Sequence, residues 1–156
     1  MKILICVATC LAVGYYSGEA TQTSVHTWFL TLEKPFFNPP NWLFMPVWTA
    51  LYIIMGVAAG LVWDKYELDK YEVKNALTMF AAQLLLNMLW SILFFALQNP
   101  MLAMFEIIVL LLIIYETYLK FRDISKIAGY LFIPYLIWVG FAMILNISIW
   151  YLNREI

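Results

Sequence analysis

Long apolar stretches alternate along this chain with short clusters of charged residues. Three stretches contain no charged residue at all: Pro35–Trp63, Asn75–Phe105 and Ile127–Asn153. Each exceeds the roughly 20 apolar residues that a helix needs to cross a bilayer. The middle stretch must bend at Gln98-Asn99-Pro100, because a polar triplet that ends in proline interrupts a helix. The pattern predicts five helices, over residues 3–20, 43–63, 75–97, 101–120 and 127–152.

The composition places these helices in a membrane. The 156 residues are 65% hydrophobic and 12% charged, whereas soluble domains are about 45–50% apolar and about 25% charged. The apolar runs are too long and too uniform for the alternating strands of a barrel. A net charge of -1 excludes a basic nucleic-acid-binding domain. We therefore predict an all-α membrane protein, a five-transmembrane-helix bundle that forms one domain over residues 1–156.

The first apolar run has an alternative reading as a signal peptide. Met1-Lys2 resembles a short basic n-region, but no A-x-A cleavage site follows the run. We expect an uncleaved span. Cys6 and Cys10 lie one helical turn apart, which favours two buried thiols over a disulfide or a metal site.

Basic residues are distributed unevenly between the two sides of the predicted bundle. Seven of the nine fall on one side: Lys2, Lys65, Lys70, Lys74, Lys120, Arg122 and Lys126. Lys34 and Arg154 fall on the other. The positive-inside rule predicts a cytoplasmic N-terminus, with the first loop and the C-terminus on the opposite side. The charged segment Asp64–Lys74 is expected to be a solvated connector.

The first loop is rich in proline and tryptophan. Residues 28–48 hold four of the six prolines and three of the seven tryptophans. An interfacial aromatic belt explains Trp28 and Trp42, but it does not explain the prolines. Because proline fixes φ and restricts the residue before it, we predict a structured Pro/Trp-rich first loop that covers the bundle as a lid.

Three helices carry stripes in which aromatic side chains alternate with amides or small residues. The stripes are Trp48, Tyr52, Met55 and Ala59; Gln83, Asn87, Trp90 and Phe94; and Tyr135, Trp138, Ala142, Leu145 and Ile149, with Asn146 beside the last. Polar side chains within a membrane face the bundle interior. The amides have two readings, interhelical hydrogen bonding or the lining of a ligand cavity, and the tryptophans favour the cavity.

Other features support weaker hypotheses. Gly14-x-x-x-Gly18 and Gly56-x-x-x-Gly60 suit either helix packing within the bundle or a dimer face. Glu106 and Glu116 are expected near the two interfaces, with a proton relay as the alternative. His26 is expected to be a surface group. No catalytic or metal-binding motif is present in the sequence.

Three blocks of the sequence resemble the translocator protein family, the tryptophan-rich sensory or TspO/MBR proteins. The blocks are Trp28…Leu32-Glu33-Lys34-Pro35-x-Phe37-Asn38-Pro39-Pro40-Asn41-Trp42…Pro46-Val47-Trp48-x-x-Leu51-Tyr52; Gln83-Leu84-x-Leu86-Asn87-x-x-Trp90-x-x-x-Phe94-Phe95; and Pro134-Tyr135-Leu136-x-Trp138-x-x-Phe141-Ala142-x-x-Leu145-Asn146-x-x-x-Trp150. The resemblance covers nearly the whole chain. It implies a five-helix bundle, often a homodimer, that binds porphyrins and in some members sterols beneath the first loop.

The resemblance also implies site residues. The ligand-binding set is Trp48, Trp138, Asn87, Trp90, Ala142, Leu145, Tyr52 and Phe94, and the lid set is Trp28, Lys34, Pro39, Pro40 and Trp42. The sterol pattern has a formal match in Leu145, Tyr151 and Arg154. Leu102 and Phe105 stand where some relatives carry Trp and Ala, and Glu106 stands where relatives have Asp.

The leading functional hypothesis is a membrane protein that binds porphyrin as a ligand and needs no cofactor or metal. Flat, apolar tetrapyrroles suit aromatic faces, and Lys34 is expected to hold a propionate. The alternatives are light- and oxygen-dependent porphyrin breakdown, in which Trp48 and Trp138 take part, and a porphyrin or sterol transporter. Whether the protein is an enzyme stays open at this point.

Overall fold

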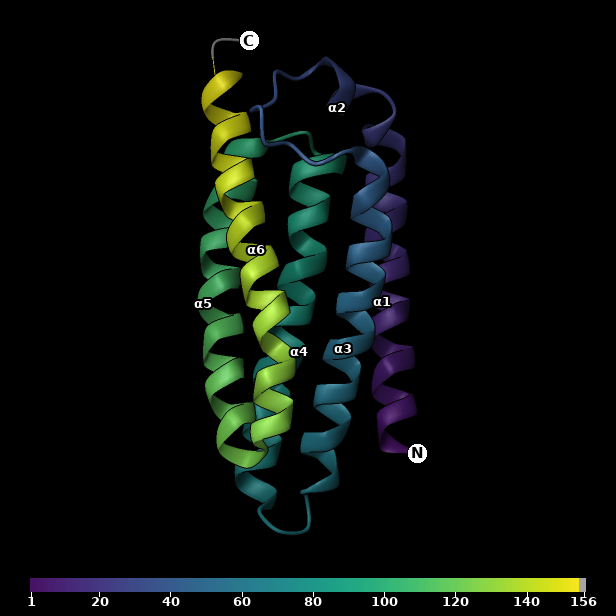
Figure 1. The fold of residues 1–156 in the computed structure, drawn as a ribbon, viewed down its shortest axis with the longest axis vertical. Helices are drawn as coiled ribbons and strands as arrows, with labels where there is room; N and C mark the ends of the chain where they lie inside the picture. The colour runs from purple at the N-terminus through teal and green to yellow at the C-terminus, as the bar shows by residue number, and fades with distance from the viewer. Residues whose placement is uncertain (155–156) are drawn as a thin grey trace.

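The computed structural model describes residues 1–154, and this part of the chain is a bundle of helices (Figure 1). The elements are α1 (Lys2–Val25), α2 (Trp28–Thr31), η1 (Asn41–Leu43), α3 (Phe44–Asp64), α4 (Lys70–Ser91), η2 (Ile92–Ala96), α5 (Pro100–Ile124) and α6 (Lys126–Leu152). Over residues 1–154, five helices are long and apolar enough to cross a membrane. The predicted all-α bundle of five spans is confirmed.

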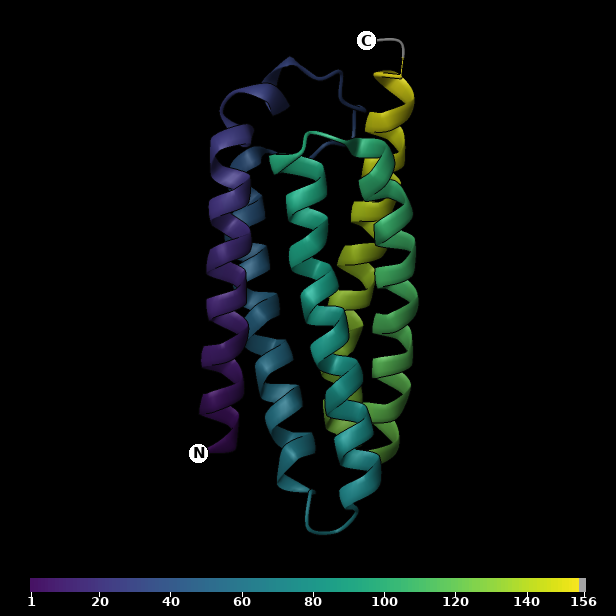
Figure 2. The same cartoon turned by 180° about the vertical axis from the view of Figure 1, so that it is seen from behind.

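The five long helices form a closed ring. α1 packs on α3 and α4, α3 on α6, α6 on α5, and α5 on α4. Figure 2 shows the bundle from behind, with α4 between α1 and α5. The start of α1 and the end of α6 lie at opposite ends of the bundle, and the segment between α1 and α3 crosses the same end as the last turn of α6 (Figure 1).

The bends that separate the helices follow local capping chemistry. The α5–α6 hairpin turns at Ser125, whose N–H donates to the carbonyl oxygen of Phe121 at 2.7 Å and whose hydroxyl accepts from the N–H of Ala128 at 3.4 Å. Asn99 caps α5 by accepting from the N–H of Leu102, and Pro100 occupies the first turn of that helix, where no N–H is needed. The predicted bend at residues 98–100 is confirmed.

The helices extend further than their apolar cores indicated. α4 begins at Lys70 rather than 75, because Asp69 accepts a hydrogen bond from the N–H of Glu72 at 3.0 Å and caps the helix. Residues 70–74 of the predicted connector Asp64–Lys74 are therefore helical, and most of its side chains are exposed, as expected of a solvated connector. The sequence predicts that the first helix ends at residue 20, but α1 continues through a polar segment to Val25.

The end of α4 is not a regular helix. Residues Ile92–Ala96 form a π-helix, and Gln98 follows with φ of 52°, a left-handed conformation that turns the chain toward α5. The hydroxyl of Ser24 in α1 donates to the carbonyl oxygen of Phe95 at 2.6 Å. The wide turn is thus tied to α1 at the end of the bundle that the first loop crosses.

The glycines of the two small-residue motifs have different surroundings. A Cβ added at Gly14 would lie 2.5 Å from the ring of Tyr52 in α3. A Cβ added at Gly56 would lie 2.5 Å from the Cα of Val7, and one at Gly60 would lie 2.5 Å from the Cα of Ile3. Gly56-x-x-x-Gly60 therefore brings the backbones of α3 and α1 together within one chain. A Cβ at Gly18, in contrast, would meet nothing within 4 Å.

Candidate functional site

The bundle encloses a cavity of about 740 Å³ at the end that the first loop crosses. Its walls come from α1, α3, α4 with η2, and α6, together with residues of the first loop. All eight residues of the predicted ligand-binding set line it: Trp48, Tyr52, Asn87, Trp90, Phe94, Trp138, Ala142 and Leu145. The geometry brings the set together, and the binding of a ligand by these residues stays a prediction.

Neighbouring rings hold the cavity tryptophans in place. Trp90 stacks on Phe94 with ring centroids 5.3 Å apart and planes at 24°. Trp138 meets Phe44 edge-on at 6.2 Å, and Trp48 lies 5.9 Å from the ring of Tyr52. Aromatic pairs in these arrangements are worth about 0.5–1.5 kcal/mol each beyond their buried area. The wall is therefore a set of supported aromatic faces.

A chain of buried hydrogen bonds forms one side of the cavity and continues below it. Tyr52 donates through its hydroxyl to Oδ1 of Asn87 at 2.8 Å, and Nδ2 of Asn87 donates to the hydroxyl of Tyr135 at 2.7 Å. Tyr135 in turn donates to Oε1 of Gln83 at 2.8 Å. The amides thus link α3, α4 and α6, which confirms interhelical hydrogen bonding. Asn87 also lines the cavity, whereas Gln83 does not, and ligand binding at this stripe stays a prediction.

A second link lies nearer the end of the bundle that the first loop crosses. The indole N–H of Trp90 donates to Oδ1 of Asn146 at 3.1 Å, and Nδ2 of Asn146 donates to the carbonyl oxygen of Pro100 at 2.8 Å. Trp138 differs, because its Nε1 is buried and has no hydrogen-bond partner. An unpaired buried donor is costly, and Trp138 lines the cavity.

The predicted lid residues divide into two groups. Trp42 lines the cavity, whereas Trp28, Lys34, Pro39 and Pro40 do not. Trp28 supports the wall from outside, edge-on to Phe94 at 5.8 Å. Nζ of Lys34 donates to the carbonyl oxygen of Leu32 at 3.0 Å and lies 4.8 Å from the centre of the Phe29 ring. In this arrangement the Lys34 ammonium contacts its own loop, and its role toward a propionate stays a prediction.

Asn153 connects the first loop to α6. Its Oδ1 accepts from the N–H of Glu33 and its Nδ2 donates to the carbonyl oxygen of Glu33, both at 2.9 Å. Nδ2 also donates to the carbonyl oxygen of Ile149 at 2.7 Å. One side chain at the end of α6 thus holds both backbone groups of a loop residue.

The contribution of α1 to the cavity was not predicted. The additional lining residues of this helix include Leu11, Gly14, Ser17, Gly18, Glu19 and Gln22. The sequence predicts helix packing or a dimer face for Gly14 and Gly18. Gly14 packs closely, since a Cβ there would lie 2.5 Å from the Tyr52 ring of α3, whereas Gly18 leaves open space. His26, expected at the surface, is exposed and lies at the edge of the same cavity.

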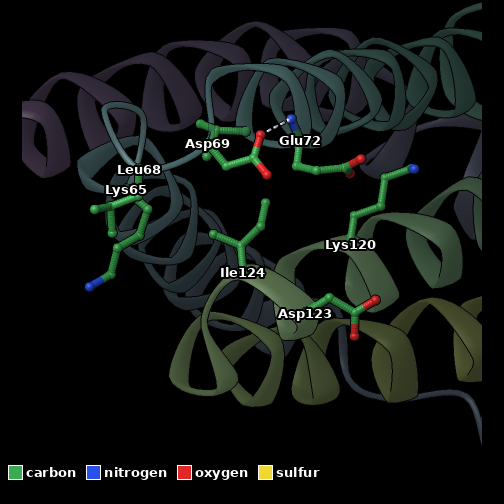
Figure 3. Close-up of a pocket in the computed structure, with 8 residues that line it drawn as sticks. Lys65, Leu68, Asp69, Glu72, Lys120, Asp123 and Ile124 are labelled. Carbon is green, nitrogen blue, oxygen red and sulfur yellow. Dashed lines mark hydrogen bonds between the residues drawn. The ribbon is translucent and has the colours of Figure 1, made fainter.

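The opposite end of the bundle has a hollow of another kind. A cleft with a volume of about 590 Å³ lies between the α3–α4 connection with the start of α4 and the last turns of α5; Figure 3 shows side chains that line it. Charged side chains of both signs line it, among them Lys65, Asp69, Glu72, Lys120 and Asp123. It is a charged cleft without the aromatic walls of the other cavity.

The remaining polar groups are two glutamates of α5 and two cysteines of α1. Glu106 was expected near an interface, but it is only 9% exposed and neither carboxyl oxygen has a hydrogen-bond partner. Glu116 is exposed. Cys6 and Cys10 are free thiols, and within residues 1–154 no group of His, Cys, Asp and Glu could hold a metal ion.

An aromatic cavity within five membrane-spanning helices, at the end crossed by a Pro- and Trp-rich loop, defines a class of small multi-pass membrane proteins. The chain belongs to the TspO/MBR family, whose family model matches residues 6–152. It is 41% identical to the tryptophan-rich protein TspO of Chlorobaculum tepidum over 98% of this chain and 96% of the relative. It is 42% identical to the tryptophan-rich protein TspO of Archaeoglobus fulgidus over 98% and 97%, and 32% identical to the translocator protein of Ovis aries over 92% and 82%.

Proposed function

We propose that this protein binds porphyrins in the cavity beneath its first loop and serves a sensory or tetrapyrrole-handling role in a membrane. The carrying observation is the single 740 Å³ space lined by Trp48, Trp90 and Trp138. Small-molecule sites commonly measure about 300–1,000 Å³ and are mostly apolar with a few polar groups. Sterols, which are also flat and apolar, are a second ligand class for the same space.

Several features of the wall support a tetrapyrrole. The macrocycle is flat and rich in π electrons, and supported indole faces suit such a ring by stacking. One relative, from Cereibacter sphaeroides, is named a tryptophan-rich sensory protein, which supports the sensory part of the proposal.

The membrane orientation is part of the same proposal. The connections α3–α4 and α5–α6, which carry most of the basic residues, lie at the end of the bundle where α1 begins (Figure 1). By the positive-inside rule that end is cytoplasmic, and the aromatic cavity opens at the opposite face. A homodimer is proposed as the assembly.

The test is a titration of protoporphyrin IX into the purified protein in nanodiscs, followed by tryptophan quenching and by the porphyrin absorbance band. The Trp48→Phe/Trp138→Phe variant removes two cavity indoles. The Trp63→Phe/Trp150→Phe variant is the matched control, because neither residue lines the cavity. We expect affinity to fall about tenfold or more only in the cavity variant, since each lost stacking contact is worth about 1 kcal/mol. Equal affinities in both variants would contradict the assignment.

Porphyrin photodegradation is a second candidate, favoured by the presence of Trp48 and Trp138 in one cavity. In this scheme bound porphyrin, excited by light, is oxidised by dioxygen while the two indoles face it. The test compares the loss of porphyrin absorbance in light with and without oxygen, for the protein and for free porphyrin. Loss no faster than that of free porphyrin would leave binding as the function.

A further inference from the structure

A serine hydroxyl in the cavity wall has no partner inside the protein. Ser17, in the second half of α1, lines the cavity and is only 5% exposed. Its Oγ is buried and has no hydrogen-bond partner within residues 1–154. A buried hydroxyl in this state is costly, because it has lost its bonds to water without replacing them. The wall therefore offers an unused hydrogen-bonding group to a molecule that enters the cavity.

The helix backbone does not use this hydroxyl, although it uses those of neighbouring residues. A serine or threonine within a helix can donate to the carbonyl oxygen one turn earlier. In α1, Thr9 donates in this way to Ile5 and Thr21 donates to the carbonyl oxygen of Ser17, both at 2.9 Å. The Ser17 hydroxyl makes no such bond. It is therefore available to the cavity.

Tyr52 provides a second hydroxyl on the same side of the cavity. Its ring contacts α1 at Gly14, three residues before Ser17, and both Tyr52 and Ser17 line the cavity. The Tyr52 hydroxyl donates its hydrogen to Oδ1 of Asn87 at 2.8 Å, and its oxygen keeps the capacity to accept a bond. A donor at Ser17 and an acceptor at Tyr52 suit a neutral oxygen group, such as a hydroxyl or a carbonyl.

The depth of Ser17 determines which edge of a ligand reaches it. His26 is exposed at the end of α1, at the edge of the cavity. Ser17 lies nine residues before His26, which corresponds to about 13–14 Å along a helix. A porphyrin whose propionates stay near His26, in contact with water, therefore brings the opposite edge of its ring toward Ser17.

We propose that Ser17 is a specificity-determining residue that recognises a neutral oxygen substituent on the ring edge opposite the propionates. The Ser17 hydroxyl donates to that oxygen, and a hydroxyl substituent donates in turn to the oxygen of Tyr52. Tetrapyrroles that carry a hydroxyl or carbonyl group on this edge therefore gain a hydrogen bond that purely hydrocarbon substituents lack. This inference rests on the proposed function, since it assigns one edge of a ligand for the same cavity.

The test uses two porphyrins that differ only on this edge. Haematoporphyrin IX carries hydroxyethyl groups there and mesoporphyrin IX carries ethyl groups, and both have the same two propionates. Affinities for the wild type and for Ser17→Ala are measured in nanodiscs, with empty nanodiscs as the partition blank. We expect Ser17→Ala to weaken the binding of haematoporphyrin about fivefold, as for the loss of one hydrogen bond. The affinity for mesoporphyrin should stay unchanged, because its ethyl groups cannot use the hydroxyl.

The matched control is Ser148→Ala, which removes the same atom from a serine of α6 outside the cavity lining. The Ser148 hydroxyl donates to the carbonyl oxygen of Ile144 at 2.8 Å, and its loss should leave both affinities unchanged. Thermal stability separates recognition from a structural role. Ser17→Ala removes no hydrogen bond from the unliganded protein, so its melting temperature should not fall. A lower melting temperature, with both porphyrins weakened equally, would overturn the inference.

Failure of this inference and failure of the proposed function give different results. If both porphyrins bind to the wild type and Ser17→Ala leaves the ratio of their affinities unchanged, the role of Ser17 is wrong while the cavity assignment stands. If neither porphyrin binds to the wild type above the blank, the proposed function fails and the inference fails with it.

Discussion

Asn153 is the side chain on which closure of the first loop over the cavity depends most directly. Replacing it with alanine removes both hydrogen bonds to the backbone of Glu33. A net contribution of about 0.5–1.5 kcal/mol is typical of one such bond. Because both bonds are exposed to solvent, the lower half of that range applies, and the pair contributes about 1–2 kcal/mol. The open state of the loop should then be about 5–30 times more populated in Asn153→Ala.

The assay is hydrogen exchange of backbone amides, read by mass spectrometry on peptides that cover residues 27–40. The N–H of Glu33 donates to Asn153, so its exchange reports directly on the link. Asn75→Ala is the control, since Asn75 lies in α4 near the opposite end of the bundle. Peptides from the end of α6 show whether the loss of the Ile149 contact frays the helix. Unchanged exchange in the loop would refute the reasoning.

Two further predictions concern the stability of the bundle. Gly60→Ala should lower the free energy of unfolding by about 1–3 kcal/mol, because its Cβ would lie 2.5 Å from the Cα of Ile3. Gly140→Ala is the control and should leave the free energy of unfolding unchanged, because a Cβ there meets nothing within 4 Å. Equal thermal stabilities of the two variants in detergent would contradict the close packing of α1 on α3. Tyr135→Phe should cost about 1–3 kcal/mol, because it leaves Oε1 of Gln83 and Nδ2 of Asn87 without their shared partner; a melting temperature like that of the wild type would show that the network is not stabilising.

The hydrophobic pattern predicted the five spans because each span is long and nearly free of charge. The cavity residues of α3, α4 and α6 could also be predicted from the sequence, since aromatic and amide side chains recur on one face of each helix. The alternation of Trp48 with Tyr52, and of Asn87 with Trp90 and Phe94, identifies a common inward side. Periodicity therefore located three of the four helical walls.

The remaining features depend on information that periodicity does not carry. The α1 wall includes Gly14, which admits the Tyr52 ring of α3, and Gly18, which leaves open space. A glycine has the same sequence signature in both cases. The π-helix at Ile92–Ala96 contacts Ser24 of α1, which is distant in the sequence. The sequence does contain a signal for the start of α4, because Asp69-Lys70-Tyr71-Glu72 has the spacing of a helix N-cap and its partner. The many charged residues of this segment instead favour a connector, which is why the prediction starts the helix at residue 75.

The burial of Glu106 and the contacts of Lys34 illustrate the same limit. Position along a helix placed Glu106 near an interface, whereas packing between helices decides its burial. The sequence predicts that Lys34 holds a ligand propionate, and only the fold shows that its ammonium contacts Leu32 and Phe29. Tertiary contacts, rather than local propensity, determine both environments.

The most direct test of the central claim fills the cavity without touching its aromatic or polar groups. Gly18 lines the cavity, and a Cβ there meets nothing within 4 Å, so Gly18→Leu should project into the ligand space. Gly140→Leu adds the same side chain at an equally open position outside the lining. The measurement is the affinity for protoporphyrin IX dimethyl ester in nanodiscs. We predict that Gly18→Leu weakens binding at least about tenfold, or about 1.4 kcal/mol, and that Gly140→Leu binds like the wild type. Wild-type affinity in the Gly18→Leu variant would contradict a ligand site in this cavity.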